Sequence, residues 1–140
     1  MQRIEVVQDY ALPVERVYAF LSEHENLGPL LGARITRVRD GDTSRNGAGS
    51  ARRLKVGPLP SFVETVTDAV PDERIAYRIT GGVTPVRDHR GELLFASTPA
   101  GSRVTWTIEL GAVVPLLDRV LAAALRRNVQ RGLAQAAARA

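Results

Sequence analysis

Length and composition already limit what this chain can be. It has 140 residues and no cysteine, with 44% apolar and 24% charged residues, a balance typical of one globular domain. The absence of cysteine excludes a disulfide framework, a thiolate nucleophile and the zinc sites that need cysteine ligands. We therefore expect residues 1–140 to form a single domain.

Charge and hydropathy limit the expected cellular location of the protein and the partners that it can bind. The net charge is +4, but eighteen of the nineteen basic residues are arginines spread along the chain, and only seven residues are aromatic. A nucleic-acid surface would gather basic residues on one face and interleave aromatics, so no nucleic-acid binding is expected. The apolar stretch 110–117 is too short to span a bilayer, and residues 1–5 lack a signal-peptide core. We expect a cytoplasmic protein without membrane insertion.

The chain before residue 33 predicts one strand followed by two short helices. Residues 3–10 alternate apolar and polar side chains, which is typical of a strand. Pro13 fits the first turn of a helix, where its missing N–H is not needed, and Val14 and Leu21 follow at helical spacing. A second short helix is expected within residues 22–31. Both helices are too short to form a core alone.

From residue 33 onward the apolar period changes to two, which predicts a run of strands. Clusters of Pro, Gly, Asp and Asn separate the segments and mark tight turns. Strands joined by such turns pair antiparallel, because parallel neighbours would need crossover helices. Sheet and helices are then segregated, as in the α+β class. The expected strands cover residues 33–39, 50–56, 61–70, 73–80, 86–97 and 102–110.

The last segment, residues 113–139, predicts one long helix rich in Leu, Ala and Arg, with Pro115 near its start. At about 100° per residue, one apolar stripe collects six side chains. These six are Leu117, Val120, Leu121, Ala124, Leu125 and Asn128. We expect a curved, seven-stranded antiparallel sheet, in the order β-α-α-β-β-β-β-β-β-α, to grip this helix and to bury the stripe.

Three segments resemble the START-like, or SRPBCC, superfamily, close to its polyketide cyclase/dehydrase-like branch. They are LPVERVYAFLS (residues 12–22, followed by Glu25-Asn26-Leu27), ETVTDAVPDERIAYR (residues 64–78) and GSRVTW (residues 101–106). The likeness covers essentially the whole chain. It implies a helix-grip fold, with a cavity between the sheet and the long helix that takes apolar small molecules.

Two departures from the family pattern bear on function. The family often carries an aromatic residue at the end of the second short helix, where this chain has Leu30-Leu31. The final helix around residues 120–128 looks most like small actinobacterial members, some of which are described as toxins of toxin–antitoxin pairs. The superfamily includes cyclases, transporters, chaperone regulators and hormone receptors, so its fold does not choose among these functions.

Asn128 is the sharpest single candidate for ligand contact. It lies in the middle of the expected apolar stripe, where a polar group without a partner costs about 1–3 kcal/mol. Either the amide faces the cavity and binds a ligand or its water, or it is a core amide satisfied by the backbone or a bound water. The sequence leaves both interpretations open.

His89 and Tyr77 are the candidate polar contacts from the sheet. His89 shares a strand side with Leu93 and Phe95, so it points inward if they do. An imidazole there could move a proton in an aldol-type cyclisation or dehydration; the alternative is a solvated histidine at the charged start of the strand. Tyr77 is expected on the inner face, where its hydroxyl could orient a ligand carbonyl or reach a backbone acceptor.

Four further residues carry predictions of their own. Trp106 lies in a strongly inward pattern that favours packing over recognition. The side on which Glu64 lies is ambiguous; if Glu64 and Arg52 both face inward they should pair, because an unpaired inward charge is costly. His24, between two glutamates, is predicted on the surface, and two isolated histidines give no support for a metal.

Three functions remain, in order of preference. The first is binding of a small apolar or polycyclic molecule, with no cofactor. The second is a polyketide cyclase/dehydratase-type enzyme in which His89, Tyr77 or Glu64 moves protons. The third is a toxin-like regulatory protein that acts on a protein partner; a homodimer is left open. The expected ligand contacts are Asn128, Tyr77, Trp106, His89, Leu121, Leu117, Ala124 and Phe62.

Overall fold

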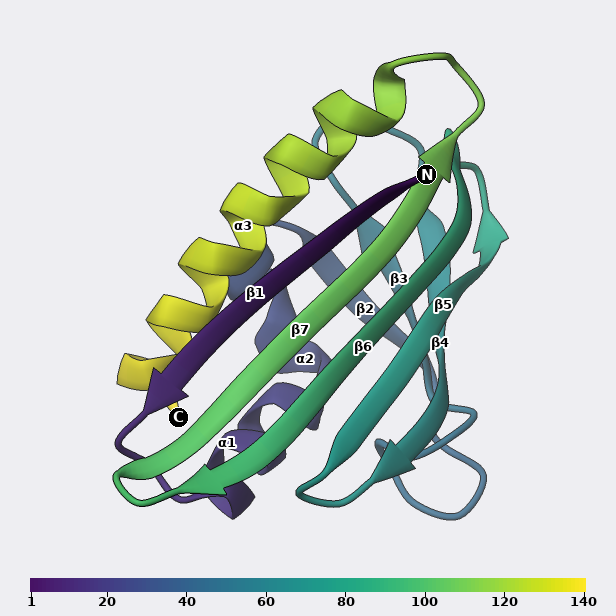
Figure 1. The fold of residues 1–140 in the computed structure, drawn as a ribbon. Helices are drawn as coiled ribbons and strands as arrows, with labels where there is room; N and C mark the ends of the chain where they lie inside the picture. The colour runs from purple at the N-terminus through teal and green to yellow at the C-terminus, as the bar shows by residue number, and fades with distance from the viewer.

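A computed structural model describes all residues from 1 to 140. Seven strands form one antiparallel sheet, and three helices lie on its inner side (Figure 1). This confirms the expected α+β helix-grip class and the expected order of elements. In chain order the elements are β1 (Gln2–Tyr10), α1 (Val14–Ser22), α2 (His24–Leu31), β2 (Arg34–Arg39), β3 (Ala51–Lys55), β4 (Phe62–Val70), β5 (Arg74–Gly82), β6 (Val86–Thr98), β7 (Gly101–Ala112) and α3 (Leu117–Arg139).

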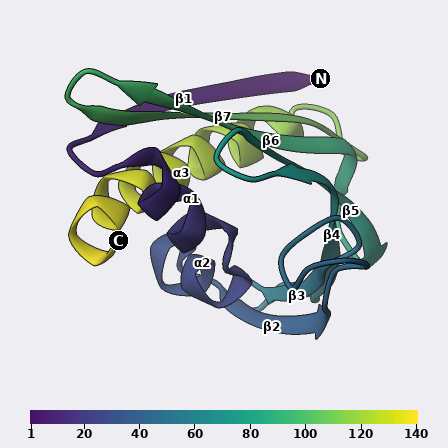
Figure 2. The ribbon, with the colours of Figure 1, turned by 90° about the horizontal axis from the view of Figure 1, so that it is seen from below.

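The sheet has the order β1-β7-β6-β5-β4-β3-β2, so each strand from β2 to β7 pairs with the next along the chain. This is the meander that the tight-turn signals predict. The first strand closes the order by pairing with the last, with Val6 opposite Trp106. The sheet curls strongly, and an end-on view shows it wrapping around the helices as an incomplete ring (Figure 2).

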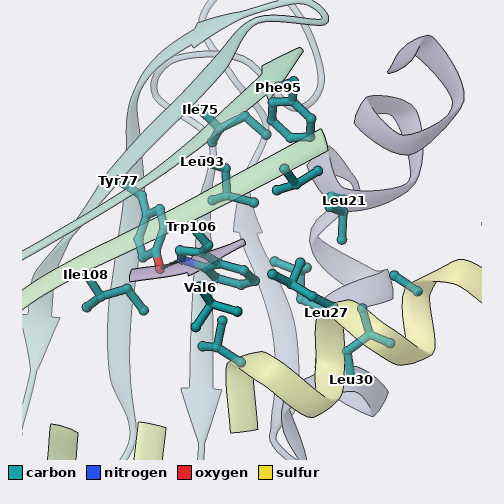
Figure 3. Close-up of a cluster of buried hydrophobic side chains, with 14 of the residues drawn as sticks. Val6, Leu21, Leu27, Leu30, Ile75, Tyr77, Leu93, Phe95, Trp106 and Ile108 are labelled. Atoms are coloured by element: carbon teal, nitrogen blue, oxygen red, sulfur yellow. Dashed lines mark hydrogen bonds between the residues drawn. The ribbon is translucent and has the colours of Figure 1, made fainter. Parts of the chain in front are cut away.

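The apolar core lies between the helices and the inner faces of β1, β4, β5, β6 and β7. Val17 of α1 and Val104 of β7 are completely buried, and they belong to a single cluster of apolar side chains from the sheet and all three helices (Figure 3). The hydroxyl of Tyr10 donates to the carbonyl oxygen of Leu133 at 2.7 Å. This bond ties the end of β1 to α3 without leaving a polar group unpaired.

Two details of α3 differ from the sequence prediction. The helix begins at Leu117 rather than at residue 113, because Leu116 adopts a left-handed conformation with φ 68°. Its buried face also differs from the predicted stripe: Val120 is 64% exposed. The buried residues are Ala122, Val129, Gly132, Leu133 and Ala136.

Packing against α2 explains this rotation of α3. A Cβ built on Gly132 would lie 2.9 Å from the backbone oxygen of Leu30, so the two helix backbones approach closely where only glycine fits. The main contacts of α3 are with β1, β7 and α2. The concave face of β3, β4 and β5 is therefore not covered by this helix (Figure 2).

Apolar side chains are exposed on three connections that meet at one end of the sheet. Val83 N–H donates to the Ser61 carbonyl at 3.2 Å, and Val113 N–H donates to the Pro85 carbonyl at 3.0 Å, so the β3–β4, β5–β6 and β7–α3 connections are neighbours. We call the exposed side chains the apolar rim: Val56, Leu59, Val83, Val113, Val114, Leu116 and Val120. None of the helices combines the length and the apolar character that crossing a bilayer requires.

We predict that Gly132→Ala lowers the free energy of unfolding by about 1–3 kcal/mol, because the added methyl group overpacks the α2–α3 contact. Urea unfolding followed by circular dichroism measures the change. Ala134 is exposed on the same helix and gives the control, since Ala134→Gly should also destabilise, by about 1 kcal/mol. Alanine is thus preferred at 134 and glycine at 132. A Gly132→Ala protein as stable as the wild type would contradict the close packing.

Candidate functional site

A group of polar and aromatic side chains lies on the concave face of the sheet, where an apolar core would be expected. Arg52 is 5% exposed, Glu64 7% and Tyr77 5%, and the His89 side chain is 7% exposed. Together with Trp106, which is 2% exposed, these residues span β3 to β7. We call this set the polar belt: Arg52, Glu64, Tyr77, His89 and Trp106.

An ion pair forms the β3–β4 part of the belt. Arg52 and Glu64 are direct partners in the antiparallel ladder, and Nε and Nη2 of Arg52 lie 3.0 and 2.8 Å from Oε1 of Glu64. The guanidinium carbon also lies 5.0 Å from the ring centre of Tyr77, within cation–π range. The conditional prediction that the two charges pair if both face inward therefore holds.

A β-bulge directs His89 toward this pair. Between Arg87 and Arg90 the β6–β7 register shifts by one residue, and Asp88 takes φ 53°. The backbone N–H of Ile79 donates to Nδ1 of His89 at 3.2 Å, so the neutral ring carries its hydrogen on Nε2. That nitrogen faces Oε2 of Glu64 at 3.7 Å. Burial lowers the pKa of His89 against the opposing effect of the Glu64 charge.

Tyr77 connects the ion pair to β7. Its hydroxyl accepts the indole N–H of Trp106 at 2.9 Å, and Figure 3 shows the two side chains meeting within the apolar cluster. Gly91 lies directly opposite Tyr77 on β6, and a Cβ at Gly91 would overlap the phenol ring. Burial raises the pKa of Tyr77 well above its usual value. The phenol therefore stays protonated. Because its oxygen accepts the hydrogen bond from Trp106, its own hydrogen can be donated to another acceptor.

Two hollows open on the surface of the molecule, and of the belt residues only Tyr77 borders one of them. One, of about 580 Å³, is on the outer face of the sheet between charged side chains such as Arg3, Arg90 and Glu92. The other, of about 310 Å³, lies between α1 and the β2–β3 loop. Neither of these two hollows lies between the sheet and α3, where the sequence predicts an apolar cavity. The β3–β6 wall of that interior carries charged and hydrogen-bonding groups.

His24 is buried, so its predicted position on the surface is wrong. It is 1% exposed, its Nε2 lies 3.0 Å from Oγ of Ser50, and burial lowers its pKa to about 3. The helical spacing of His24 with Leu27 and Leu30 was a usable signal, because all three share the buried face of α2. The two glutamates beside His24 instead contact a separate cluster of charged side chains.

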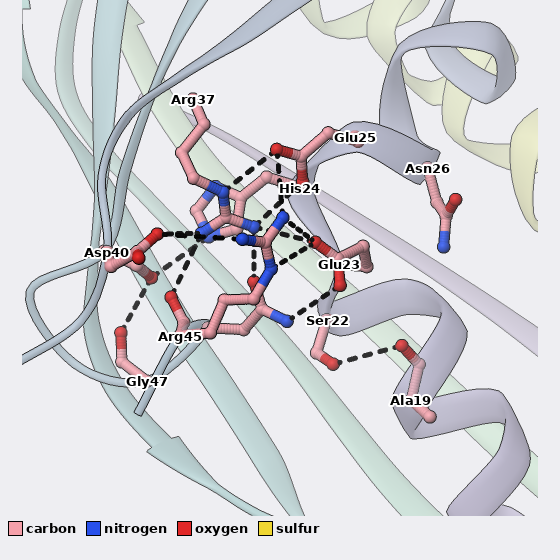
Figure 4. A network of polar contacts seen from close by, with 12 residues as sticks. Ala19, Ser22, Glu23, His24, Glu25, Asn26, Arg37, Asp40, Arg45 and Gly47 are labelled. Atoms are coloured by element: carbon pink, nitrogen blue, oxygen red, sulfur yellow. Dashed lines mark hydrogen bonds and ion pairs between the residues drawn. The ribbon is translucent and has the colours of Figure 1, made fainter. Parts of the chain in front are cut away.

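That cluster is centred on Arg37 of β2 and lies over the His24 ring (Figure 4). Nη2 of Arg37 donates to Glu23 at 2.9 Å, to Glu25 at 2.8 Å and to Asn46 at 2.6 Å. The hydrogen bond from Arg37 lowers the pKa of Glu25 to about 2. These contacts fix the β2–β3 loop against the start of α2 and exclude solvent from the imidazole beneath.

The candidate residues of α3 are not gathered around the belt. Asn128 is half-buried, and its Oδ1 accepts a hydrogen bond from Arg131 at 2.6 Å; it lies outside the buried face of α3, which corrects its predicted place within an apolar stripe. Leu117 and Leu121 are half-buried and Ala124 is exposed. Half-buried Phe62 begins β4, two residues before Glu64. No three acidic or histidine side chains come together in an arrangement that could hold a metal ion.

The family described as polyketide cyclase / dehydrase and lipid transport matches residues 1–140. No curated protein matches this sequence. Solved structures with the same fold show low sequence identity, so their likeness concerns the fold alone.

Three of these structures cover almost the whole chain. A protein from Thermus thermophilus has a TM-score of 0.78 and 19% identity, and the match covers 97% of each chain. The Zhui aromatase/cyclase from a Streptomyces species has a TM-score of 0.77 and 18% identity, covering 96% of this chain and 93% of that one. A START superfamily protein from Mycobacterium smegmatis has a TM-score of 0.78 and 13% identity, covering 98% and 95%.

We predict that Arg52→Met and Glu64→Leu each lower the free energy of unfolding by about 3–5 kcal/mol, because each leaves one buried charge unpaired. The double variant should be more stable than either single variant, since it removes both charges. Urea unfolding at neutral pH measures all three. Asp9→Asn, which breaks the exposed pair with Arg103, is the control and should cost almost nothing. Additive losses in the double variant would contradict the pairing.

Proposed function

We propose that this chain, a member of the polyketide cyclase/dehydrase and lipid transport family, binds a small apolar molecule whose oxygen-bearing end contacts the polar belt. The observation that carries the proposal is the buried Arg52–Glu64 pair with His89 and Tyr77 beside it. A buried ion pair seldom improves stability over well-packed apolar residues. Its presence on the concave face therefore favours a role in recognition.

The belt has hydrogen-bonding capacity that its internal contacts do not use. The Tyr77 hydroxyl accepts from Trp106 and retains its own proton; Nε2 of His89 carries a hydrogen and is too far from Glu64, at 3.7 Å, for a hydrogen bond. Oε2 of Glu64 is a free acceptor. Two donors and one acceptor in a dry, apolar surrounding suit a ketone or hydroxyl group on an otherwise apolar body.

The apolar rim is consistent with entry of such a molecule. Three of its side chains, Val56, Leu59 and Val83, come from connections that adjoin the ends of β3, β4 and β5, the strands that α3 leaves uncovered. An apolar patch exposed at the end of a monomer commonly marks an interaction or ligand-entry site. The route from solvent to the belt would then pass apolar side chains before polar ones.

The first test uses two-ring probes that differ only in a ketone group. 1-Tetralone should bind about 3- to 10-fold more tightly than tetralin, because the Tyr77 hydroxyl donates to its carbonyl oxygen. Quenching of Trp106 measures both affinities, since this is the only tryptophan in the chain and it touches Tyr77.

In Tyr77→Phe the preference for the ketone should disappear, whereas Tyr18→Phe should retain it. Tyr18 is the matched control because its ring packs on Phe95, outside the belt. Circular dichroism shows whether each variant is folded. Equal affinity for the two probes in the wild type, or no binding of either, would remove the support for this proposal.

A second function, proton transfer in a cyclase/dehydratase-type reaction, is favoured by one specific distance. Oε2 of Glu64 and Nε2 of His89 lie 3.7 Å apart in a buried setting, so one group can take a proton while the other gives one. In the dehydration of a β-hydroxy ketone, Glu64 would remove the proton next to the carbonyl. His89, in its protonated form, would protonate the departing hydroxyl, which leaves as water, and the proton taken up by Glu64 would restore the imidazolium.

This second function has its own test with 4-hydroxy-4-phenylbutan-2-one, whose dehydration gives a conjugated ketone that absorbs in the near ultraviolet. An enzyme should produce that absorbance, and His89→Gln should reduce the rate by about 100-fold or more. Glutamine retains an acceptor for the Ile79 N–H, so the bulge can persist. Absorbance that never exceeds the rate of the protein-free reaction would leave binding as the function.

A further inference from the structure

We infer that the apolar rim docks on the surface of an anionic lipid bilayer. Its apolar side chains would lie at the level of the lipid headgroups, and the cations beside it would face the lipid phosphates. No part of the chain would cross the bilayer. This docking surface is independent of the proposed ligand, because it lies on the outside of the molecule and needs no space in the interior.

Exposed apolar side chains concentrate at this one end of the molecule. The chain has eleven exposed large apolar residues, and seven of them form the apolar rim. An eighth, Met1, lies beside the rim, since its amine is 3.4 Å from Asp118 at the start of α3 (Figure 1). The other three, Val7, Val38 and Leu94, lie on three separate strands. Apolar side chains gathered in this way on a monomer indicate an interaction surface.

The connections that carry the rim contain no charged residue, whereas two connections at the opposite end of the sheet are acidic (Figure 1). The rim connections are VGPLPS (residues 56–61), VTP (residues 83–85) and VVPL (residues 113–116). Surface loops are ordinarily polar. The β2–β3 and β4–β5 connections hold one cation, Arg45, and four acids, Asp40, Asp42, Asp72 and Glu73.

Four cations lie beside the rim connections, either close to them in the chain or opposite such a neighbour across the ladder. We call them the rim cations: Arg34, Lys55, Arg87 and Arg119. Two acids, Asp88 and Asp118, are equally close, but Asp118 already pairs with the N-terminal amine. Arg34 and Lys55 lie directly opposite each other, and like charges in that position are destabilising. An anion beside the two cations would remove that repulsion.

Leu116 is held in a strained conformation with its side chain in solvent. It occupies the N-cap position of α3 with φ 68°, makes no side-chain cap hydrogen bond and is 67% exposed. Left-handed backbone favours glycine or asparagine, and an N-cap favours a short polar side chain. Leucine is therefore unfavourable here for the fold alone. An apolar environment outside the protein would give its side chain a favourable contact.

The arrangement fits an anionic bilayer better than a second copy of the chain. A two-fold contact between two rims would bring the rim cations of both copies together, and the net charge of +4 on each copy adds to the repulsion. At a bilayer, apolar side chains enter the boundary between headgroups and acyl chains while lysine and arginine reach the phosphates. The negative surface potential attracts each cation, and the acidic connections face away.

The first experiment measures co-sedimentation of the full chain with vesicles of two compositions. One is phosphatidylcholine alone, and the other is an equimolar mixture of phosphatidylcholine and phosphatidylglycerol. Binding to the anionic vesicles should be at least about 10-fold tighter, and it should weaken as added salt screens the charges. No binding to the anionic vesicles, or equal binding to both compositions, overturns bilayer docking.

Two arginines provide a matched pair of variants for the charge. Arg119 of α3 lies at the rim and Arg16 of α1 at the opposite end (Figure 1). Both are exposed, and each is the third residue of its helix and follows an acid. Arg119→Glu and Arg16→Glu change the net charge equally, but only Arg119→Glu should weaken binding to the anionic vesicles, by about 10-fold. Equal losses would assign the binding to total charge and overturn the rim contact.

Leu116→Asn tests the apolar contact separately from folding. Asparagine suits a left-handed N-cap, so the urea midpoint should stay equal or rise, whereas binding to the anionic vesicles should fall by about 10-fold. Leu94→Thr removes an exposed leucine of β6 and is the control that should bind as the wild type does. A folded Leu116→Asn protein with wild-type vesicle binding overturns the rim contact. So does a wild-type dimer in gel filtration that this variant abolishes.

Vesicle binding and ligand binding fail separately. Vesicle binding by a chain that binds neither 1-tetralone nor tetralin leaves the bilayer contact standing and removes support for the proposed function. Binding of 1-tetralone by a chain that ignores anionic vesicles overturns the bilayer contact alone. Should Leu116→Asn not fold, the two arginine variants still decide whether the rim faces the lipid.

Discussion

The ion pair between Arg52 and Glu64 determines the character of the interior. Taking two charges out of water is costly, and the attraction between them compensates only when their geometry is good and their remaining polar atoms are satisfied. Direct opposition on β3 and β4 supplies the geometry, and the Tyr77 ring beside the guanidinium adds a cation–π contact. Oε2 of Glu64 lies only 3.7 Å from a buried imidazole, so this wall of the sheet places charged and hydrogen-bonding groups directly beside the apolar core.

The apolar core and the polar belt share the inner face of one sheet. Around β1 and β7 the interior is closed by α3, which lies against α2 with no side chain at Gly132 to separate the helices. Around β3 to β6 the strands curve away from α3 and carry the polar belt. Local backbone distortions serve the belt: the bulge at Asp88 turns His89 inward, and Gly91 leaves room for the Tyr77 ring. Buried apolar side chains of β4, β5 and β6, such as Val66, Ile75 and Leu93, complete the core beside the belt.

Much of the fold could be predicted because its signals are local. Period-two alternation and tight-turn residues located all seven strands to within about two residues. The alternation around Leu93 put His89 on the same strand side as Leu93 and Phe95, but left open whether it was solvated. The errors arose where distant elements meet. The rotation of α3 depends on its contact with Leu30 of α2, and the burial of His24 depends on Ser50 and the Arg37 cluster. The spacing of His24 with Leu27 and Leu30 indicates a shared helix face, but the partners that bury His24 and rotate α3 lie in distant segments.

The sequence by itself determined the class of fold, the order of the elements and the inner side of most strands, because these follow from periodicity over a few residues. Only the tertiary structure decided that Glu64 meets Arg52, that Asn128 bonds to Arg131 outside the buried face, and that His24 is enclosed with one nitrogen unpaired. Those outcomes depend on strand register and on helix packing between segments far apart in the chain. The same pattern of apolar residues is compatible with several such arrangements, and the packing of backbones selects one of them.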